Sequence, residues 1–165
     1  MRVIKRIYLF LPVLLIFSGC GNGADNLPEL SAKVFKAFKA QDQTLLSACE
    51  PSTDQMEKAI ELYLEDTTRT VEARKDAAIN KTASLKLTLN QEFVNMLEQA
   101  KAKNIDWKTA TIKDFNYTIN GHIADYKDAN VRVIIICGKE MNVLKYKAYL
   151  FGDRWYLIEG LAWEK

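Results

Sequence analysis

Residues 131–158 read VRVIIICGKEMNVLKYKAYLFGDRWYLI. Three segments of this stretch, 131–137, 144–150 and 155–158, place apolar side chains at every second position. Such alternation predicts β-strands, because successive side chains of a strand point to opposite faces of its sheet. Gly138-Lys139-Glu140 and Gly152-Asp153 separate the segments and are typical of hairpin turns. We therefore predict an antiparallel meander in the C-terminal half of the chain.

One further strand precedes this meander. Phe115, Tyr117 and Ile119 are separated by single polar residues, which predicts a strand of the same kind. Two positions compete for the turn that follows it. Asn120-Gly121 is the stronger turn dipeptide, whereas residues 125–128 leave strands of better length.

The N-terminal half is predicted to be helical. Pro28 suits a first helical turn, and the apolar residues that follow recur at helical spacing. They are Val34, Phe35, Phe38, Leu45 and Leu46. After Pro51, the segment Ser52-Thr53-Asp54-Gln55 matches a capping box and predicts a second helix. Its inner stripe would comprise Met56, Ile60, Tyr63, Leu64, Thr67 and Val71.

A third helix is predicted after a second capping-box match at residues 88–91, with Phe93, Met96, Leu97 and Ala100 on one face. Just before it, Leu85, Leu87 and Leu89 alternate with polar residues and predict a brief strand. Helices first and a meander last predict an α+β fold, in which N-terminal helices pack on a curved antiparallel sheet of four or more strands.

The N-terminus carries a targeting signal. Arg2, Lys5 and Arg6 precede an apolar run at residues 7–17, which is too short for a membrane span and contains a proline. Ser18-Gly19 then leads into Cys20, and this arrangement resembles a bacterial lipoprotein signal. The resemblance implies that residues 1–19 are removed and that Cys20 is lipidated.

The predicted organisation is a signal peptide at 1–19, a lipidated cysteine with a tether at 20–27, and one domain at 28–165. The acyl chains on Cys20 would make the membrane a partner and place the protein in the bacterial cell envelope. Residue 21 is Gly instead of the Asp that resembles an inner-membrane retention signal, which favours the outer membrane if the host is Gram-negative.

Composition narrows the classes of function. The formal net charge is +2, but three of the basic residues belong to the signal, so the mature chain is nearly neutral. We therefore expect no nucleic-acid partner. The chain has a single histidine and no ligand-spaced cluster, so we expect neither a metal site nor a cofactor. Cys49 and Cys137 either form a disulfide or lie apart as buried small side chains.

Two segments resemble the nuclear transport factor 2-like (cystatin-like) cone, and in particular small bacterial lipoproteins that carry this cone as a domain of unknown function. They are residues 32–46 and residues 129–158, the latter closing with Gly152-Asp153-Arg154-Trp155-Tyr156-Leu157-Ile158. The resemblance implies a pocket between helices and sheet, which some relatives use for isomerase or dehydratase chemistry with an Asp or His base and a Tyr donor. The donor tyrosine of these relatives lies in the first helix and has no counterpart here, because the corresponding face carries Phe35 and Phe38. The helical stretch at 66–83 is also longer than the family pattern.

Candidate pocket residues follow from strand alternation. Glu159 would share an inward face with Trp155 and Leu157, unless the strand ends or bulges near Gly160 and leaves the carboxylate in water. Three tyrosines either present hydroxyls to the pocket or pack as core aromatics: Tyr63, Tyr117 and Tyr146. His122 is either a surface loop residue or a general base.

The outward face of the predicted sheet is unusually apolar. It would carry Ile134, Ile136, Tyr149, Tyr156 and Ile158 beside Arg132, Lys145 and Lys147. This mixture predicts an interface, for instance a homodimer through the sheet face, unless a helix or residues 161–163 cover it.

The sequence thus favours a lipid-anchored, non-enzymatic binding or assembly module whose ligand it does not identify. The rival hypothesis is a small-pocket enzyme or a carrier for an apolar ligand, with Glu159 and a tyrosine in the cone cavity.

Overall fold

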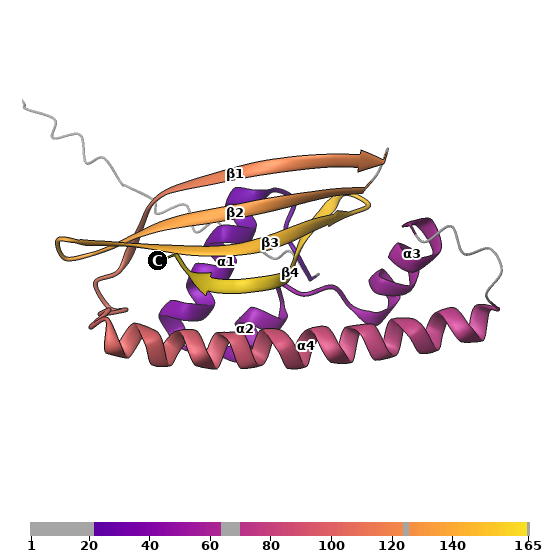
Figure 1. The fold of residues 1–165 in the computed structure, drawn as a ribbon, viewed down its shortest axis with the longest axis horizontal. Coiled ribbons are helices and arrows are strands. Elements are labelled where there is room, and N and C mark those ends of the chain that lie inside the picture. Colours follow the sequence, from indigo (N-terminus) through magenta and orange to yellow (C-terminus); the bar gives the residue numbers. More distant parts are fainter. Residues whose placement is uncertain (1–21, 64–69, 124–125, 165) are drawn as a thin grey trace, which may run out of the picture.

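The computed structural model describes residues 22–63, 70–123 and 126–164 (Figure 1). Its helices are α1 (Leu27–Ala40), α2 (Gln43–Ser47), α3 (Thr53–Tyr63) and α4 (Val71–Ala102). Its strands are β1 (Thr111–Ile123), β2 (Tyr126–Cys137), β3 (Glu140–Phe151) and β4 (Arg154–Trp163). The strands form one antiparallel sheet in the order β1-β2-β3-β4. The predicted α+β class is therefore confirmed.

Helix α1 begins and ends at clear signals. The Asn26 side chain accepts a hydrogen bond from the backbone N–H of Glu29, and Pro28 lies in the first turn. At the other end Gln41 adopts a left-handed conformation with φ of 53°, which stops the helix before Leu45 and Leu46. The single apolar stripe of the sequence is thus divided between α1 and α2.

The capping box predicted for α3 is present. The Ser52 N–H donates to Gln55 Oε1 over 2.7 Å, and the Gln55 N–H donates to Ser52 Oγ over 3.3 Å. Helix α3 ends at Tyr63, whose side chain lies outside the described residues, as do residues 64–69.

Helix α4 corrects three predictions at once. It is a single helix of 32 residues that starts after the N-cap Thr70, so neither the strand at 85–89 nor the capping box at 88–91 exists. Leu85 and Leu89 pack against the core while Leu87 is 71% exposed, which is the pattern of a helix face. Val71 opens this new helix and is half exposed, so it does not continue the inner stripe of α3.

The core lies between one face of the sheet and the helices. In Figure 1, α1 crosses behind the strands and α4 runs below β4. Four aromatic rings fill the space between them: Phe38 has ring centroids 4.6 Å from Phe93, 5.7 Å from Trp107 and 6.5 Å from Trp163. The Trp163 Nε1–H donates to the carbonyl of Met96 over 3.2 Å and ties β4 to α4.

Two hairpin turns lie where the sequence predicts them, since Gly138 and Gly152 both have φ of 62°. The turn between β1 and β2 lies at neither of the two positions that the sequence suggests, Asn120-Gly121 and residues 125–128. Ile123 pairs with Tyr126, so Asn120-Gly121 lies inside β1 and Asp128 inside β2. The turn residues 124–125 themselves lie outside the described residues.

The outer edge of β4 is covered by the chain that precedes α3. Ala24 and Trp155 exchange backbone hydrogen bonds of 2.9 and 2.7 Å, and the Leu157 N–H donates to the carbonyl of Cys49 over 2.9 Å. Further along, the Leu161 N–H donates to Glu92 Oε2 over 3.0 Å. Unpaired strand edges invite association with other chains, and these contacts remove that hazard on the β4 side.

The fold consequently begins earlier than Pro28. Gly23 and Ala24 are buried, and the Gly23 N–H donates to the carbonyl of Ala48. Gly23 has φ of 78°, and a Cβ built on it would lie 2.5 Å from Tyr156 Cε1 and 2.7 Å from the Trp155 carbonyl oxygen. Only glycine fits at this position without displacement of backbone.

We predict that Gly23→Ala destabilises the fold strongly, by about 3 kcal/mol or more, because it combines left-handed strain with a clash against backbone. Gly152→Ala is the matched control, since its φ is also positive but a Cβ there meets nothing within 4 Å. The control should lose only about 1–2 kcal/mol. The free energies of unfolding in urea compare the two, and equal losses would contradict the packing of Gly23.

Candidate binding pocket between α3 and the β3–β4 hairpin

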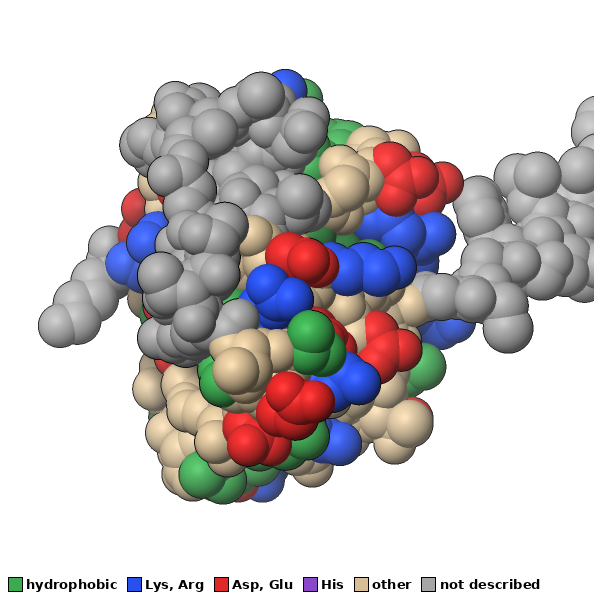
Figure 2. All heavy atoms as spheres, turned by 90° about the vertical axis from the view of Figure 1, so that its right-hand side faces the viewer, with side chains coloured by type: hydrophobic (Ala, Val, Ile, Leu, Met, Phe, Trp, Pro, Cys, Tyr) green, Lys and Arg blue, Asp and Glu red, His purple; other side chains and the backbone are tan. Residues whose placement is uncertain are grey.

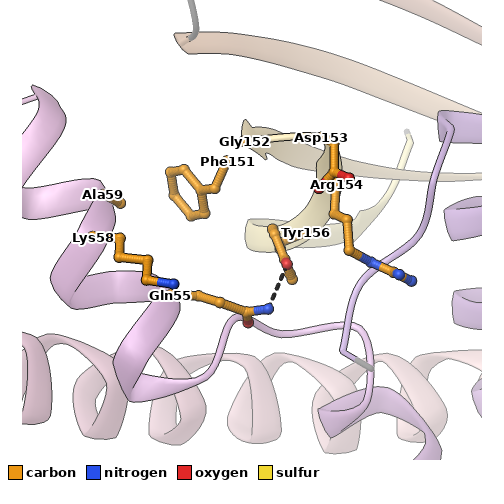
Figure 3. A pocket seen from close by; sticks show the side chains of 8 residues that line it. All are labelled: Gln55, Lys58, Ala59, Phe151, Gly152, Asp153, Arg154 and Tyr156. Atoms are coloured by element: carbon orange, nitrogen blue, oxygen red, sulfur yellow. Dashed lines mark hydrogen bonds between the residues drawn. The ribbon is translucent and has the colours of Figure 1, made fainter. Parts of the chain in front are cut away.

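A pocket of about 260 Å³ lies between α3 and the β3–β4 hairpin (Figure 3). It is lined by Gln55, Lys58 and Ala59 from α3 and by Phe151, Gly152, Asp153, Arg154 and Tyr156 from the hairpin. Drug-sized ligands occupy roughly 300–1,000 Å³, so this pocket suits a small group or one side chain of a partner.

Tyr156 forms the floor of the pocket. It lies on the outer sheet face, next to Tyr149, but is only 2% exposed because the Gly23 backbone lies against its ring. The Phe151 ring stacks on it with centroids 5.7 Å apart. Its hydroxyl accepts a hydrogen bond of 2.6 Å from Gln55 Nε2.

Gln55 has two structural roles that fix its orientation. Its Oε1 accepts from the Ser52 N–H in the capping box, so its amide nitrogen is the atom that faces Tyr156. The capping box therefore not only starts α3 but also positions the donor that joins α3 to β4.

The polar groups of the pocket are suited to binding. Burial, partly offset by Arg154 and the Gln55 hydrogen bond, raises the pKa of the Tyr156 hydroxyl, so it stays protonated at neutral pH. Figure 3 shows the Lys58 ammonium near Gln55, whereas Arg154 extends away on the other side of Tyr156. There its guanidinium lies 3.3 Å from Asp25 Oδ1 and donates to the Gly23 carbonyl over 3.3 Å.

Figure 2 views the molecule from the end at which α3 lies. Lys, Arg, Asp and Glu side chains alternate across its visible surface. The described part of this face therefore presents no large patch of one sign of charge.

Among the side chains that the structure describes, the predicted cone-pocket residues are not all brought together. Tyr146 is buried and shares a 2.9 Å hydrogen bond with the Ser31 hydroxyl, and Trp155 packs in the core. Tyr117 lies on β1 and is 47% exposed. The side chains of Tyr63 and His122 lie outside the described residues.

Glu159 lies on the outer face, as the bulge alternative in the sequence anticipated. The β3–β4 register shifts on both sides of Lys147, and Gly160 has φ of 77°. The shift turns the Glu159 carboxylate away from Trp155 and into water, where it lies 3.0 Å from Lys147 Nζ.

The apolar outer sheet face, on which the predicted interface depends, is present in part. Ile134, Ile136, Tyr149 and Ile158 are half-buried on the outer sheet face, near the exposed Arg132 and Lys145. Tyr156 is removed from this face by Gly23 and Gln55 and belongs to the pocket instead.

Cys49 and Cys137 are free thiols, so of the two alternatives for these cysteines the structure has the one in which they lie apart. Cys49 Sγ donates to the Leu45 carbonyl beside β4, while Cys137 lies at the β2–β3 hairpin and accepts from the Asp106 N–H. Burial raises the pKa of the Cys49 thiol to about 12, which keeps it protonated and unreactive at neutral pH.

Sequence reasoning missed the pocket. The sequence predicts a role for Gln55 only in the capping box of α3. No sequence pattern indicates that Lys58 and Phe151 lie in the same pocket. Buried Glu50 was also missed: it is 4% exposed, and burial raises the pKa of its carboxyl despite nearby Lys86.

Among the described residues, no cluster of side chains is suited to a metal ion. No helix in the described ranges is long and apolar enough to cross a membrane. Comparison with models of known protein families, with curated proteins and with solved structures finds no match for this chain.

We predict that stability falls as the pH rises from about 9 towards 12. The unfolded Cys49 thiol loses its proton near 9.0, whereas the folded thiol keeps it until about 12, so alkali favours the unfolded chain. The full shift corresponds to at most about 4 kcal/mol, and buried Tyr146, whose pKa is also raised, adds to the loss above pH 10.

Urea unfolding measured between pH 8 and pH 11 tests this. Cys49→Ala should flatten the fall in stability, whereas Cys137→Ala should retain the wild-type slope. If Cys49→Ala and the wild type have parallel curves, the thiol is not the group that titrates.

Proposed function

We propose that this protein is a lipid-anchored binding module of the bacterial cell envelope, held to its membrane by acyl chains on Cys20 and acting without catalysis. One observation carries the proposal: the backbone is already fixed to the fold at Gly23. A chain that resembles a lipoprotein signal up to Cys20 thus continues into folded structure within a few residues.

The contacts of Gly23 define how closely the domain would be held. Its carbonyl accepts hydrogen bonds from Lys33 Nζ, at 2.7 Å, and from Arg154, at 3.3 Å. Only Gly21 and Asn22 separate it from Cys20, and an extended residue spans at most about 3.6 Å. The Cα of Cys20, whose residue would carry the acyl chains, would therefore lie within about 11 Å of the Gly23 Cα, which restricts how far the domain can move from the membrane.

The pocket is adjacent to this attachment. Arg154 and Tyr156 line it, and both also contact Gly23. We infer that the pocket opens near the lipid headgroups and takes a small polar group presented there, by a lipid or by an envelope partner. The Gln55 amide, the Tyr156 hydroxyl and the Lys58 ammonium would contact that group.

The packing of the interior supports binding over the rival cone-cavity enzyme or carrier. The Phe38, Phe93, Trp107 and Trp163 rings occupy the space between helices and sheet, and Glu159 lies on the opposite face. An outer-membrane address remains part of the proposal for a Gram-negative host.

We expect Cys20→Ser to move the protein from the detergent phase to the aqueous phase, because it removes the only site for the acyl chains. Phase partitioning after expression in a bacterium that processes lipoproteins measures this. Cys137→Ser is the control and should stay in the detergent phase. An unchanged partition of Cys20→Ser would contradict lipidation.

We also expect the β3–β4 hairpin to lie close to the bilayer. A fluorophore attached at Asp153→Cys should be quenched by nitroxide-labelled lipid headgroups, whereas one at Lys139→Cys should not. Residue 139 lies at the other end of β3, whose twelve residues span about 40 Å. Both labels require Cys137→Ser as background.

A flexible insertion tests whether the short segment between Cys20 and Gly23 orients the domain or only anchors it to the membrane. Ten Gly and Ser residues inserted after Gly21 should leave membrane binding unchanged but equalise quenching at the two labels. Equal quenching before the insertion would show that the domain already turns freely and would overturn the orientation.

A further inference from the structure

Helix α4 has a second apolar face that points away from the core. Ile79 is 54% exposed, Leu87 is 71% exposed and Val94 is 48% exposed. With exposed Ala83 they lie on one side of the helix, at spacings close to whole turns. The residues that face the core, such as Phe93 and Met96, lie on a different side.

This face, which we call the α4 stripe, extends from Ile79 to Val94, half of the 32-residue helix, and its side chains are exposed. In Figure 1 no element is drawn below α4, the side opposite the sheet. Three large aliphatic side chains on one helix face are more than scattered surface residues, and such a face is typical of an interaction surface.

The charges at the two ends of the stripe identify its partner. Lys75 and Glu72 precede Ile79 by four and seven residues, so they continue its side of the helix towards the N-terminus. Glu98 and Lys101 follow Val94 at the same spacings towards the C-terminus. Each of these four charged residues is exposed.

Turning α4 end for end therefore exchanges Ile79 with Val94 and places each of these four charged residues opposite one of the other sign. We propose that the α4 stripe binds the α4 stripe of a second copy of this chain, antiparallel and about a two-fold axis near Leu87. In this register Glu72 meets the partner's Lys101, and Lys75 meets the partner's Glu98, each pair occurring twice.

The alternative orientation is disfavoured by the same residues. A parallel pair in register would place Glu72 against its own copy and Lys75 against its own copy, and like charges in contact are destabilising. Within one chain Lys101 Nζ lies 2.7 Å from Glu98 Oε1, but this pair is about two-thirds exposed and can rearrange at little cost.

The proposal goes beyond the membrane-bound binding module and needs neither the Cys20 anchor nor the pocket. It also differs from a homodimer through the outer sheet face, which would use Ile134 and Tyr149. The two surfaces can be tested separately in the same chain.

Cysteine cross-linking in the full-length, membrane-bound protein tests the orientation, with Cys137→Ser as background. Glu72→Cys and Lys101→Cys should each fail to form disulfide-linked dimers alone, because equivalent residues would lie about 44 Å apart along the antiparallel pair. Co-expression of the two variants should give dimers at least tenfold more efficiently. Dimers of Glu72→Cys alone would indicate parallel association and overturn the proposal.

Charge reversal provides the matched control. In chains that carry Leu87→Cys at the two-fold axis, Glu72→Lys should reduce cross-linked dimer several-fold, and adding Lys101→Glu should restore it. Lys81→Glu, on another side of α4, should have no effect. Loss of dimer with Ile134→Lys but not with Glu72→Lys would assign association to the sheet face instead.

The α4 stripe could instead contact a lipid surface, and a further experiment distinguishes this from the dimer. If a fluorophore at residue 87 is quenched by nitroxide lipids, and Leu87→Cys gives no dimer, the stripe lies on the bilayer and the proposal fails. Failure here leaves the Cys20 partitioning result untouched, so the two proposals stand or fall separately.

Discussion

The backbone pairing of Ala24 with Trp155 is the contact on which the rest of the molecule depends. It closes the edge of β4, so the sheet can end there without exposing unpaired donors and acceptors. It also presses Gly23 against the Tyr156 ring, which buries an aromatic residue on a sheet face that otherwise meets solvent. The pocket floor, the start of the fold and the attachment to the predicted anchor are therefore one structural unit.

Helix α4 is long because its two halves pack against different parts of the molecule. Its C-terminal half buries Leu89, Phe93 and Met96 in the main core, while its N-terminal half forms a smaller cluster with Met56 and Ile60 of α3. That smaller cluster is stabilised less by burial, because it contains few large side chains. The capping box and the Gln55–Tyr156 hydrogen bond hold α3 in place at the end where it meets the sheet.

Local chemistry explains which features the sequence could predict. Alternation in β2, β3 and β4, the hairpin glycines and the Ser52–Gln55 capping box are short-range signals, and each has its expected structure. Local patterns fail where they are compatible with two structures. The alternating residues Leu85, Leu87 and Leu89 fit a strand, but Leu85 and Leu89 also fit one face of a helix. The pocket could not be predicted, since it joins α3 to β4 through a contact between residues 101 positions apart, which only tertiary packing specifies.

The proposed antiparallel pairing of α4 and the proposed short attachment at Gly23 would together constrain how a dimer meets its membrane. Helix α3 lies towards the end of the molecule at which α4 begins (Figure 1), so a two-fold axis near Leu87 would set the two copies of α3 at opposite ends of the pair. Both sets of acyl chains can enter one bilayer only if that axis runs along the membrane normal. The paired helices would then lie parallel to the membrane plane, and the two pockets would open at either end of the assembly. A longer tether would relax this requirement, whereas two residues between Cys20 and Gly23 make it strict.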